Sequence, residues 1–149
     1  MGKVTIDIIL RNHIDQMVQR DHPEQAIRSL ELDNVIVDSG ASMLCLSKDI
    51  IDELGLVKLR TKNVNTATEQ TILDIYGTVE LEIMERAAIF EVMELKHPTI
   101  KGLVGQIPLE SFDLLIHPGI NRLIPNPEHD NKLVLDLLLT DDILGYKPR

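Results

Sequence analysis

An apolar strand at Val35–Val37 runs straight into Asp38, and Ser39 and Gly40 follow at once. A buried strand normally avoids Asp, because an ionised carboxylate in apolar surroundings must be paired or must change its pKa. Gly40 can adopt backbone angles that are closed to other residues, so the chain can turn sharply there. The arrangement suggests a site built around Asp38, and the chemistry that a carboxylate offers is proton transfer.

Asp38-Ser39-Gly40 is also a common turn sequence, in which Asp and Ser bond to their own backbone and Gly supplies a positive φ. The flanking sequence favours a site over a plain turn. A short apolar strand is expected at Met43–Leu46. A helix is expected across residues 47–56, because Ser47 can cap its start and Gly55 can close its end.

A second apolar segment, Gly102-Leu103-Val104-Gly105, lies well downstream of this turn. A helix is expected directly after it, since Pro108 suits the first turn of a helix. Leu109, Phe112 and Ile116 are expected on one buried face of that helix.

Together, the two blocks resemble the retropepsin-like aspartic proteases, the bacterial members in particular. Residues 38–41 match the family signature Asp-Ser/Thr-Gly-Ala after a hydrophobic strand, and residues 103–105 match its hydrophobic-hydrophobic-Gly element. Residues 112–119 and 123–128 are similar to the bacterial group, so the resemblance extends from residue 4 to residue 129. It implies that the second strand passes next to the catalytic loop, where its glycine allows a close backbone approach.

The resemblance implies an aspartic endopeptidase that acts on peptides or proteins without a cofactor or a metal ion. In such an enzyme an ionised carboxyl activates water and a protonated carboxyl donates to the carbonyl. The chain has a single Asp-Ser-Gly loop, so a homodimer must bring one Asp38 from each chain to the twofold axis. Two carboxyl groups that lie so near each other cannot both ionise readily, so they share a proton.

By the same resemblance, Asp38 is catalytic, Ser39 and Gly40 support the dyad, and Ala41 leaves room for a substrate backbone. Further substrate contacts are expected from the tip of a hairpin flap and from the second block: Thr66, Ala67, Thr68, Glu69, Leu103, Val104 and Gly105. Glu69 can either contact substrate or remain a solvated turn residue.

The chain departs from the viral members of the family at two places. The candidate flap tip, residues 66–71, lacks the glycines of the viral tip, and Gln106 stands where viral enzymes carry an Arg whose ion pairs support the dimer. Two other functions therefore stay open. One is a catalytically weak retropepsin-like module that dimerises or binds peptides, and the other, on size and acidity alone, is a small regulatory protein.

Composition limits the classes of partner. The 149 residues include 15 basic and 24 acidic ones, a net charge of −9, whereas nucleic-acid and anionic-membrane surfaces need clustered Lys and Arg. No apolar stretch approaches the roughly 20 residues that span a bilayer, and the N-terminal apolar run is too short for a signal-peptide core. The lone Cys45, expected to be a small core residue rather than a nucleophile, is compatible with a reducing cytoplasm, the expected location.

The remaining pattern is mostly that of β-strands, expected at residues 4–10, 30–37, 58–67, 72–84 and 87–95. Residues 78–83 alternate cleanly between apolar and polar. The polar residues 12–23 are expected to form a loop or a wide hairpin. The predicted fold is mainly β, a retropepsin-like closed β-barrel with one or two short helices.

One protease domain is expected over residues 1–130. The tail, residues 131–149, contains an apolar run from Leu133 to Leu139, expected either to dock on its own domain as a strand or helix or to join the dimer interface. No metal site is expected from His117, His129 and Asp130, because their spacing matches no ligand motif.

Overall fold

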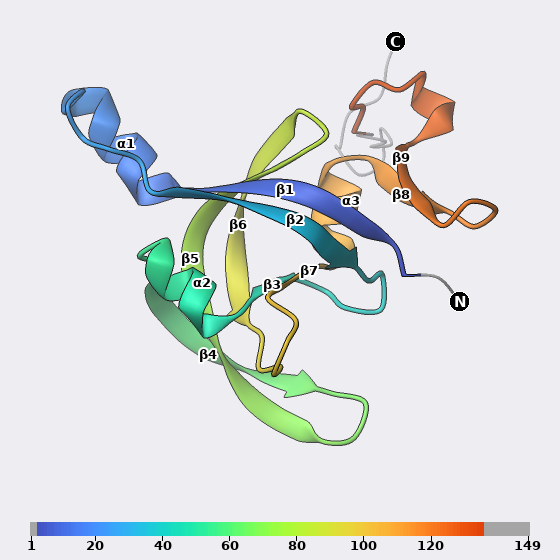
Figure 1. Cartoon of the computed structure of the whole chain (residues 1–149), viewed down its shortest axis with the longest axis horizontal. Helices are drawn as coiled ribbons and strands as arrows, with labels where there is room; N and C mark the ends of the chain where they lie inside the picture. The colour runs from blue at the N-terminus through green and yellow to red at the C-terminus, as the bar shows by residue number, and fades with distance from the viewer. Residues whose placement is uncertain (1–2, 136–149) are drawn as a thin grey trace, which may run out of the picture.

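The computed structural model describes residues 3–135, and over that range the chain is mainly β with short helices (Figure 1). The strands are β1 (Thr5–Asn12), β2 (Ser29–Val37), β3 (Leu44–Leu46), β4 (Val57–Asn65), β5 (Gln70–Ile83), β6 (Arg86–Glu94), β7 (Gly102–Val104), β8 (Leu114–His117) and β9 (Arg122–Pro125). The helices are α1 (His13–Asp21), α2 (Lys48–Glu53), α3 (Gln106–Ser111) and the 3-10 helix η1 (Pro127–His129).

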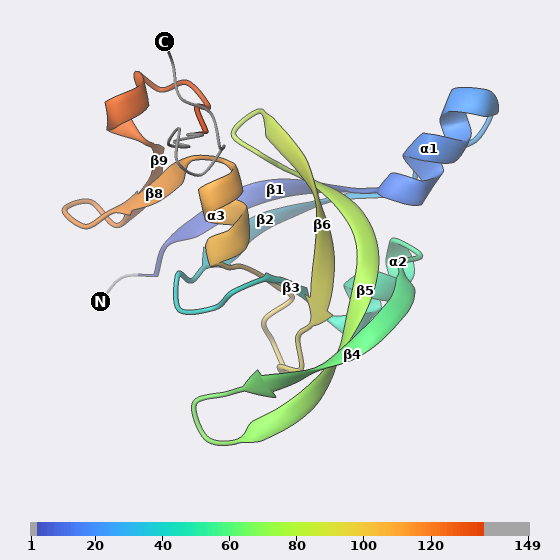
Figure 2. The same cartoon turned by 180° about the vertical axis from the view of Figure 1, so that it is seen from behind.

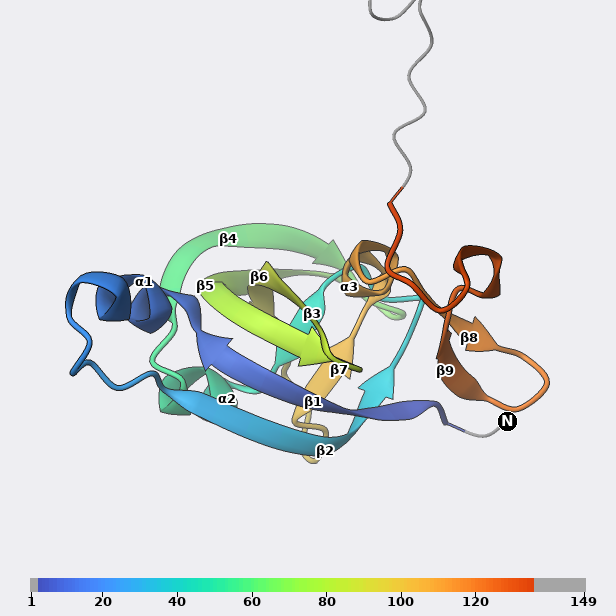
Figure 3. The same ribbon diagram turned by 90° about the horizontal axis from the view of Figure 1, so that it is seen from above.

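Six strands close into a barrel. Hydrogen-bonded neighbours follow the order β1-β2-β7-β3-β6-β5, and β5 pairs with β1 to complete the ring. Among the described strands β4 pairs with β5 alone, and the hairpin of these two strands extends beyond the barrel (Figure 2). The separate hairpin β8–β9 lies beside the beginning of β1 (Figure 3). The prediction of a mainly β, closed-barrel fold is confirmed.

The core is filled from alternate positions of the strands. In β5, Val79, Leu81 and Ile83 are buried while the residues between them are partly exposed, as the alternation predicts. Phe112, from the end of α3, enters the same core and meets Phe90 edge to face, with ring centroids 5.6 Å apart. Strands between residues 5 and 125 therefore share one core, and α2 and α3 each contribute buried side chains to it.

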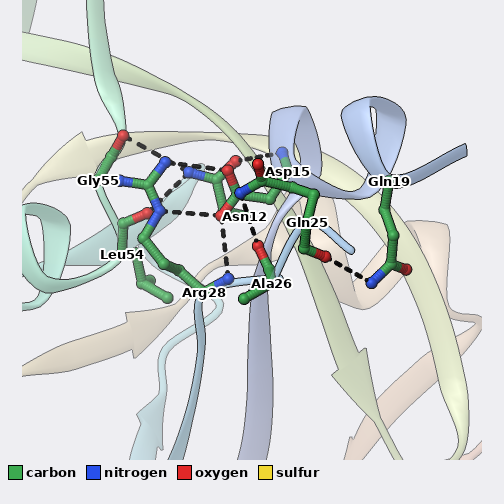
Figure 4. Close-up of polar contacts among 8 residues, drawn as sticks. All are labelled: Asn12, Asp15, Gln19, Gln25, Ala26, Arg28, Leu54 and Gly55. Atoms are coloured by element: carbon green, nitrogen blue, oxygen red, sulfur yellow. Dashed lines mark hydrogen bonds and ion pairs between the residues drawn. The ribbon is translucent and has the colours of Figure 1, made fainter. Parts of the chain in front are cut away.

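Residues 12–23 do not form the loop or wide hairpin that their polarity predicted, but the helix α1. The side chain of Asn12 caps the helix by accepting a hydrogen bond from Asp15 N at 3.0 Å. Asp15 is buried and accepts three hydrogen bonds from Arg28, as Figure 4 shows. The pattern misled because the inner face of α1 is held by the buried carboxylate of Asp15, paired with the exposed Arg28, whereas the apolar side chains of the helix are exposed: Ile14, Met17 and Val18.

The helix predicted across residues 47–56 is present as the shorter α2. Gly55 has a φ of 67°, and the amides of Gly55 and Leu56 donate to the carbonyls of Asp52 and Ile51, which closes the helix as predicted. Ser47 stands at the N-cap position, but its hydroxyl donates to Asp49 instead of capping the helix.

The third helix, α3, has Pro108 in its first turn as predicted. Leu109 and Phe112 are buried, but Ile116 lies in β8 rather than on the helix. The helix ends because Asp113 takes a positive φ of 54°, which a continuing helix does not allow. With α1, α2 and α3, the described chain has more helices than the one or two that were predicted.

No helix within residues 3–135 is both long enough and apolar enough to cross a bilayer. Residues 131–135 form neither helix nor strand, and residues 136–149 lie outside the described residues. The docking of the tail and its role at a dimer interface remain predictions, as does the domain boundary near residue 130.

Candidate active site

Asp38 lies just beyond the end of β2, and its carboxylate is exposed. The amide of Gly40 donates to Asp38 Oδ1 at 2.8 Å, and the amide of Ala41 donates to the Asp38 carbonyl at 3.1 Å. Within residues 3–135 the second carboxyl oxygen, Oδ2, has no hydrogen-bond partner. The turn thus fixes one oxygen of the carboxylate and leaves the other one available to water or a ligand.

Three main-chain hydrogen bonds hold the loop of residues 38–43 against the second sequence block. They fix the loop at both ends, so its position does not depend on side-chain packing alone. The bonds run from Asp38 N to Val104 O (3.0 Å), from Gln106 N to Ala41 O (2.8 Å) and from Ile107 N to Ser42 O (2.9 Å).

Gly105 is the residue that permits this close approach. A Cβ atom at this position would lie 2.5 Å from the carbonyl oxygen of Met43 and 2.8 Å from that of Ala41. Both atoms belong to the backbone of the loop, so neither can rotate away. The close backbone approach predicted for this glycine is confirmed.

A cleft of about 820 Å³ opens beside the loop. Its walls come from the loop, the distal half of β4, the middle of β6 and the start of α3. The lining residues are Asp38 and 40–44, Lys62–Asn65, 89–91 with Met93, and Ile107 with Pro108. The volume falls within the range of ordinary ligand pockets, and most of the side chains that line it are apolar.

Two carboxylates occur among the described residues that line the cleft, Asp38 and Glu91. Glu91 on β6 is ion-paired with Arg60 on β4, so its charge is already compensated. Asp38 is therefore the carboxylate that can take part in proton transfer, and this chain offers no second, unpaired one in the described lining.

The hairpin tip predicted to touch substrate does not line this cleft. Thr66 closes the tip on itself, since its hydroxyl accepts from Glu69 N at 3.1 Å and donates to Glu69 O at 2.9 Å. Ala67, Thr68 and the Glu69 side chain are exposed, which agrees with the solvated alternative for Glu69. The hairpin does contribute to the cleft, but through Lys62–Asn65 on β4.

The other predicted site residues divide into two groups. Gly40 and Ala41 line the cleft together with Asp38, and Ser39 is exposed beside them. Val104 and Gly105 are buried, Leu103 is half-buried in β7, and none of the three lines the cleft. In this second group, Val104 and Gly105 position the loop through their backbone, and a contact of the three residues with substrate stays a prediction.

Sequence reasoning missed the wall formed by Ile89, Phe90 and Met93 of β6 and by Lys62 of β4. A signal was present in β6, where the large apolar Ile89 is 41% exposed and follows the exposed Ala87 and the partly exposed Ala88. Which face of β6 meets a ligand follows from strand pairing, and pairing is not visible in the sequence.

Cys45 is a buried residue of β3, which confirms its predicted place in the core. Burial, with a smaller contribution from the charge of Asp38, raises the pKa of its thiol to about 11. Because the thiolate is the nucleophilic form, Cys45 is not a nucleophile at neutral pH.

The remaining polar candidates have local partners. His129 is paired with Asp113, His117 Nδ1 accepts from Gly119 N at 3.1 Å, and Gln106 Nε2 donates to Glu110 at 3.1 Å. Within residues 3–135 no group of three or more His, Cys, Asp or Glu side chains is placed to hold a metal ion.

The candidate site thus consists of one exposed carboxylate, held by a glycine amide, at the mouth of a mainly apolar cleft. No family model matches this chain, and no curated protein matches it.

Proposed function

We propose that this chain is an aspartic endopeptidase of the retropepsin-like type that acts as a homodimer. The observation that carries the proposal is the exposed carboxylate of Asp38, fixed by Gly40 N–H at 2.8 Å beside a cleft that can hold a peptide. The closed barrel, with β7 and Gly105 against the catalytic loop, supports the same proposal.

The proposed reaction needs two carboxyl groups in different protonation states. An ionised Asp38 takes a proton from a water molecule, which attacks the peptide carbonyl, while a protonated carboxyl donates to the carbonyl oxygen. When the tetrahedral intermediate collapses, a carboxyl returns a proton to the leaving amine. Two neighbouring carboxyls that share one proton supply both states at once.

The need for a second copy follows from the composition of the cleft. In the described lining the other carboxylate, Glu91, is committed to Arg60, and an ion-paired carboxylate does not serve as a proton donor. The Asp38 of a second, identical chain is the group that the proposal requires, at a twofold axis that passes by the loop.

A digest of a peptide library between about pH 4 and pH 7 tests this function. Wild type should cleave peptides, and Asp38→Asn should lower the rate by about 10²–10⁴-fold, the usual contribution of an acid–base group. The control is Asp33→Asn, which removes an exposed carboxylate of β2 that does not line the cleft. Equal cleavage by wild type and Asp38→Asn would contradict the proposal.

A second candidate function is supported by the hairpin tip, where Thr66 and Glu69 bond to each other rather than to residues of the cleft. A retropepsin-like module with little turnover would bind peptides in the cleft without cutting them. In that case wild type and Asp38→Asn bind the same peptides equally, and neither releases products.

A further inference from the structure

Charged side chains are few among the described residues that line the cleft: Asp38, Lys62 and Glu91. The charge of Glu91 is cancelled by Arg60, and Asp38 is the group assigned to the chemistry. Lys62 is exposed and forms no ion pair with any other residue of the described range. Its ammonium group is therefore the uncompensated cation of the cleft wall.

The pairing of β4 with β5 places Lys62 on the inner side of the hairpin. Residues directly opposite one another in an antiparallel pair lie on the same face. Lys62 is opposite the half-buried Leu73, and Arg60 is opposite the buried Ile75. Since successive side chains alternate between faces, Lys62 comes next after Arg60 on this inner face.

Exposed apolar side chains share the cleft lining with this cation. Ile89 of β6 and Ile107 of α3 are 41% and 50% exposed, so each has a large apolar area left to cover. An occupant that covers them excludes water from the cleft. An ion pair formed by Lys62 under those conditions is stronger than one in open solvent, because the local dielectric constant is lower.

We propose that Lys62 is a specificity-determining residue that selects peptides with a Glu or Asp near apolar side chains. This inference rests on the proposed function to the extent that the cleft must hold a peptide. The chain as a whole carries a charge of −9 and repels acidic peptides. Binding of an acidic peptide therefore requires a local positive charge, and Lys62 carries the uncompensated positive charge in the described wall of the cleft.

Matched peptide pairs, identical except that Gln replaces Glu, test the role of Lys62. Wild type should cleave the Glu peptide with a kcat/KM roughly fivefold higher, which corresponds to about 1 kcal/mol for a partly exposed ion pair. Lys62→Met should bring this ratio close to one, and Lys62→Glu should turn it in favour of Gln. The control is Lys58→Met, which removes a cation of the same strand that pairs with Asp74 outside the cleft and should keep the wild-type ratio.

Binding of the same peptides, labelled with a fluorophore, separates this inference from the proposed function. The protein used is Asp38→Asn, with and without Lys62→Met, and the readout is fluorescence anisotropy. Tighter binding of the Glu peptide that disappears with Lys62→Met supports the inference even if wild type cleaves nothing. Asp38-dependent cleavage with no discrimination between Glu and Gln, or equal binding of the two peptides, overturns the inference and leaves the protease proposal intact.

Discussion

At the scale of single residues, Gly105 connects the two sequence blocks because its missing side chain lets the backbone just after β7 lie against the loop of residues 38–43. The loop atoms that a Cβ would strike belong to the backbone of Ala41 and Met43. Gly105 has a φ of −91°, which any residue adopts, so the requirement for glycine is one of space and not of backbone conformation.

Gly105→Ala should therefore destabilise the fold by about 1–3 kcal/mol, the usual cost of forcing an extra carbon into a packed site. It should also lower the activity of the loop beside it. Urea unfolding measures the first effect. Gly102→Ala, at the start of the neighbouring β7, is the matched control, because the nearest contact of its Cβ is a Val35 side-chain atom at 3.4 Å. Equal losses for the two variants would contradict the steric explanation.

Asp15 is the second residue whose surroundings determine how much it stabilises the fold. It is buried, and hydrogen bonds from Arg28 hold the pKa of its carboxyl below the usual value. Asp15→Asn keeps the shape but removes the charge and leaves Arg28 without its partner, so a loss of about 1–3 kcal/mol is expected in urea unfolding. Asp21→Asn, at the exposed end of the same helix, should change the free energy of unfolding by less than about 0.5 kcal/mol.

At the scale of elements, Asn12 joins two helices. Its side-chain oxygen caps α1, and its Nδ2 donates to the Leu54 carbonyl at 2.7 Å, at the end of α2 (Figure 4). The free carbonyl at one helix end and the free amide at the start of another are thus satisfied by a single buried side chain.

Asn12→Ala should cost about 2 kcal/mol, because it removes both the cap and the buried hydrogen bond to α2. Asn12→Ser can still cap α1 but has no amide to donate to Leu54, so its loss should be smaller. Thermal and urea unfolding of both variants distinguish the two contributions. Identical losses for Ala and Ser would show that the cap contributes nothing measurable.

Most strands were predictable because their signal is local. The alternation in residues 78–83 and the apolar run before Asp38 each specify a strand without reference to distant parts of the chain. Helix α1 was not predictable in this way, since its inner face depends on Arg28, which lies 13 positions beyond Asp15. A polar pattern reveals a helix only when the distant partner of its buried charge is known.

The residues of the candidate site likewise divide into those with a local sequence signal and those placed by tertiary structure. Asp38, Gly40 and Gly105 were predictable because each group comes directly after an apolar strand, and this flanking sequence distinguishes the loop from an ordinary Asp-Ser-Gly turn. The wall at Lys62 was not, because the pairing of β4 with β5 shifts register between Lys58 and Arg60. That irregularity decides which β4 side chains face the barrel, and it arises from tertiary packing.

At the scale of the whole molecule, the proposed dyad predicts how activity responds to mixed subunits. When wild type and Asp38→Asn are mixed and allowed to exchange, activity at constant total protein should fall with the square of the wild-type fraction. An equal mixture should keep about one quarter of the activity, because a random pair has two wild-type subunits at that frequency. A linear fall, with about half remaining, would indicate a site contained in one chain.

The stability of the whole chain should decline in acid. Hydrogen bonds lower the pKa of Asp15 (from Arg28), of Asp49 to about 2 (from Ser47 and then Lys101) and of Asp113 (from His129). A carboxyl with a lowered folded-state pKa stabilises the fold above its unfolded value and loses that effect as the pH falls through the folded value. Urea midpoints should therefore drop progressively below about pH 4, and less steeply in Asp15→Asn; a midpoint independent of pH in that range would contradict this assignment.

The position of β7 in the barrel has a consequence for folding during synthesis. β7 is three residues long, yet it fills the gap between β2 and β3, parallel to one and antiparallel to the other. A nascent chain cannot complete the ring before residue 104 has left the ribosome, so the edges of β2 and β3 stay unpaired until then. Closure that depends on so distant a segment slows folding, and until it is complete the unpaired strand edges are exposed to aggregation.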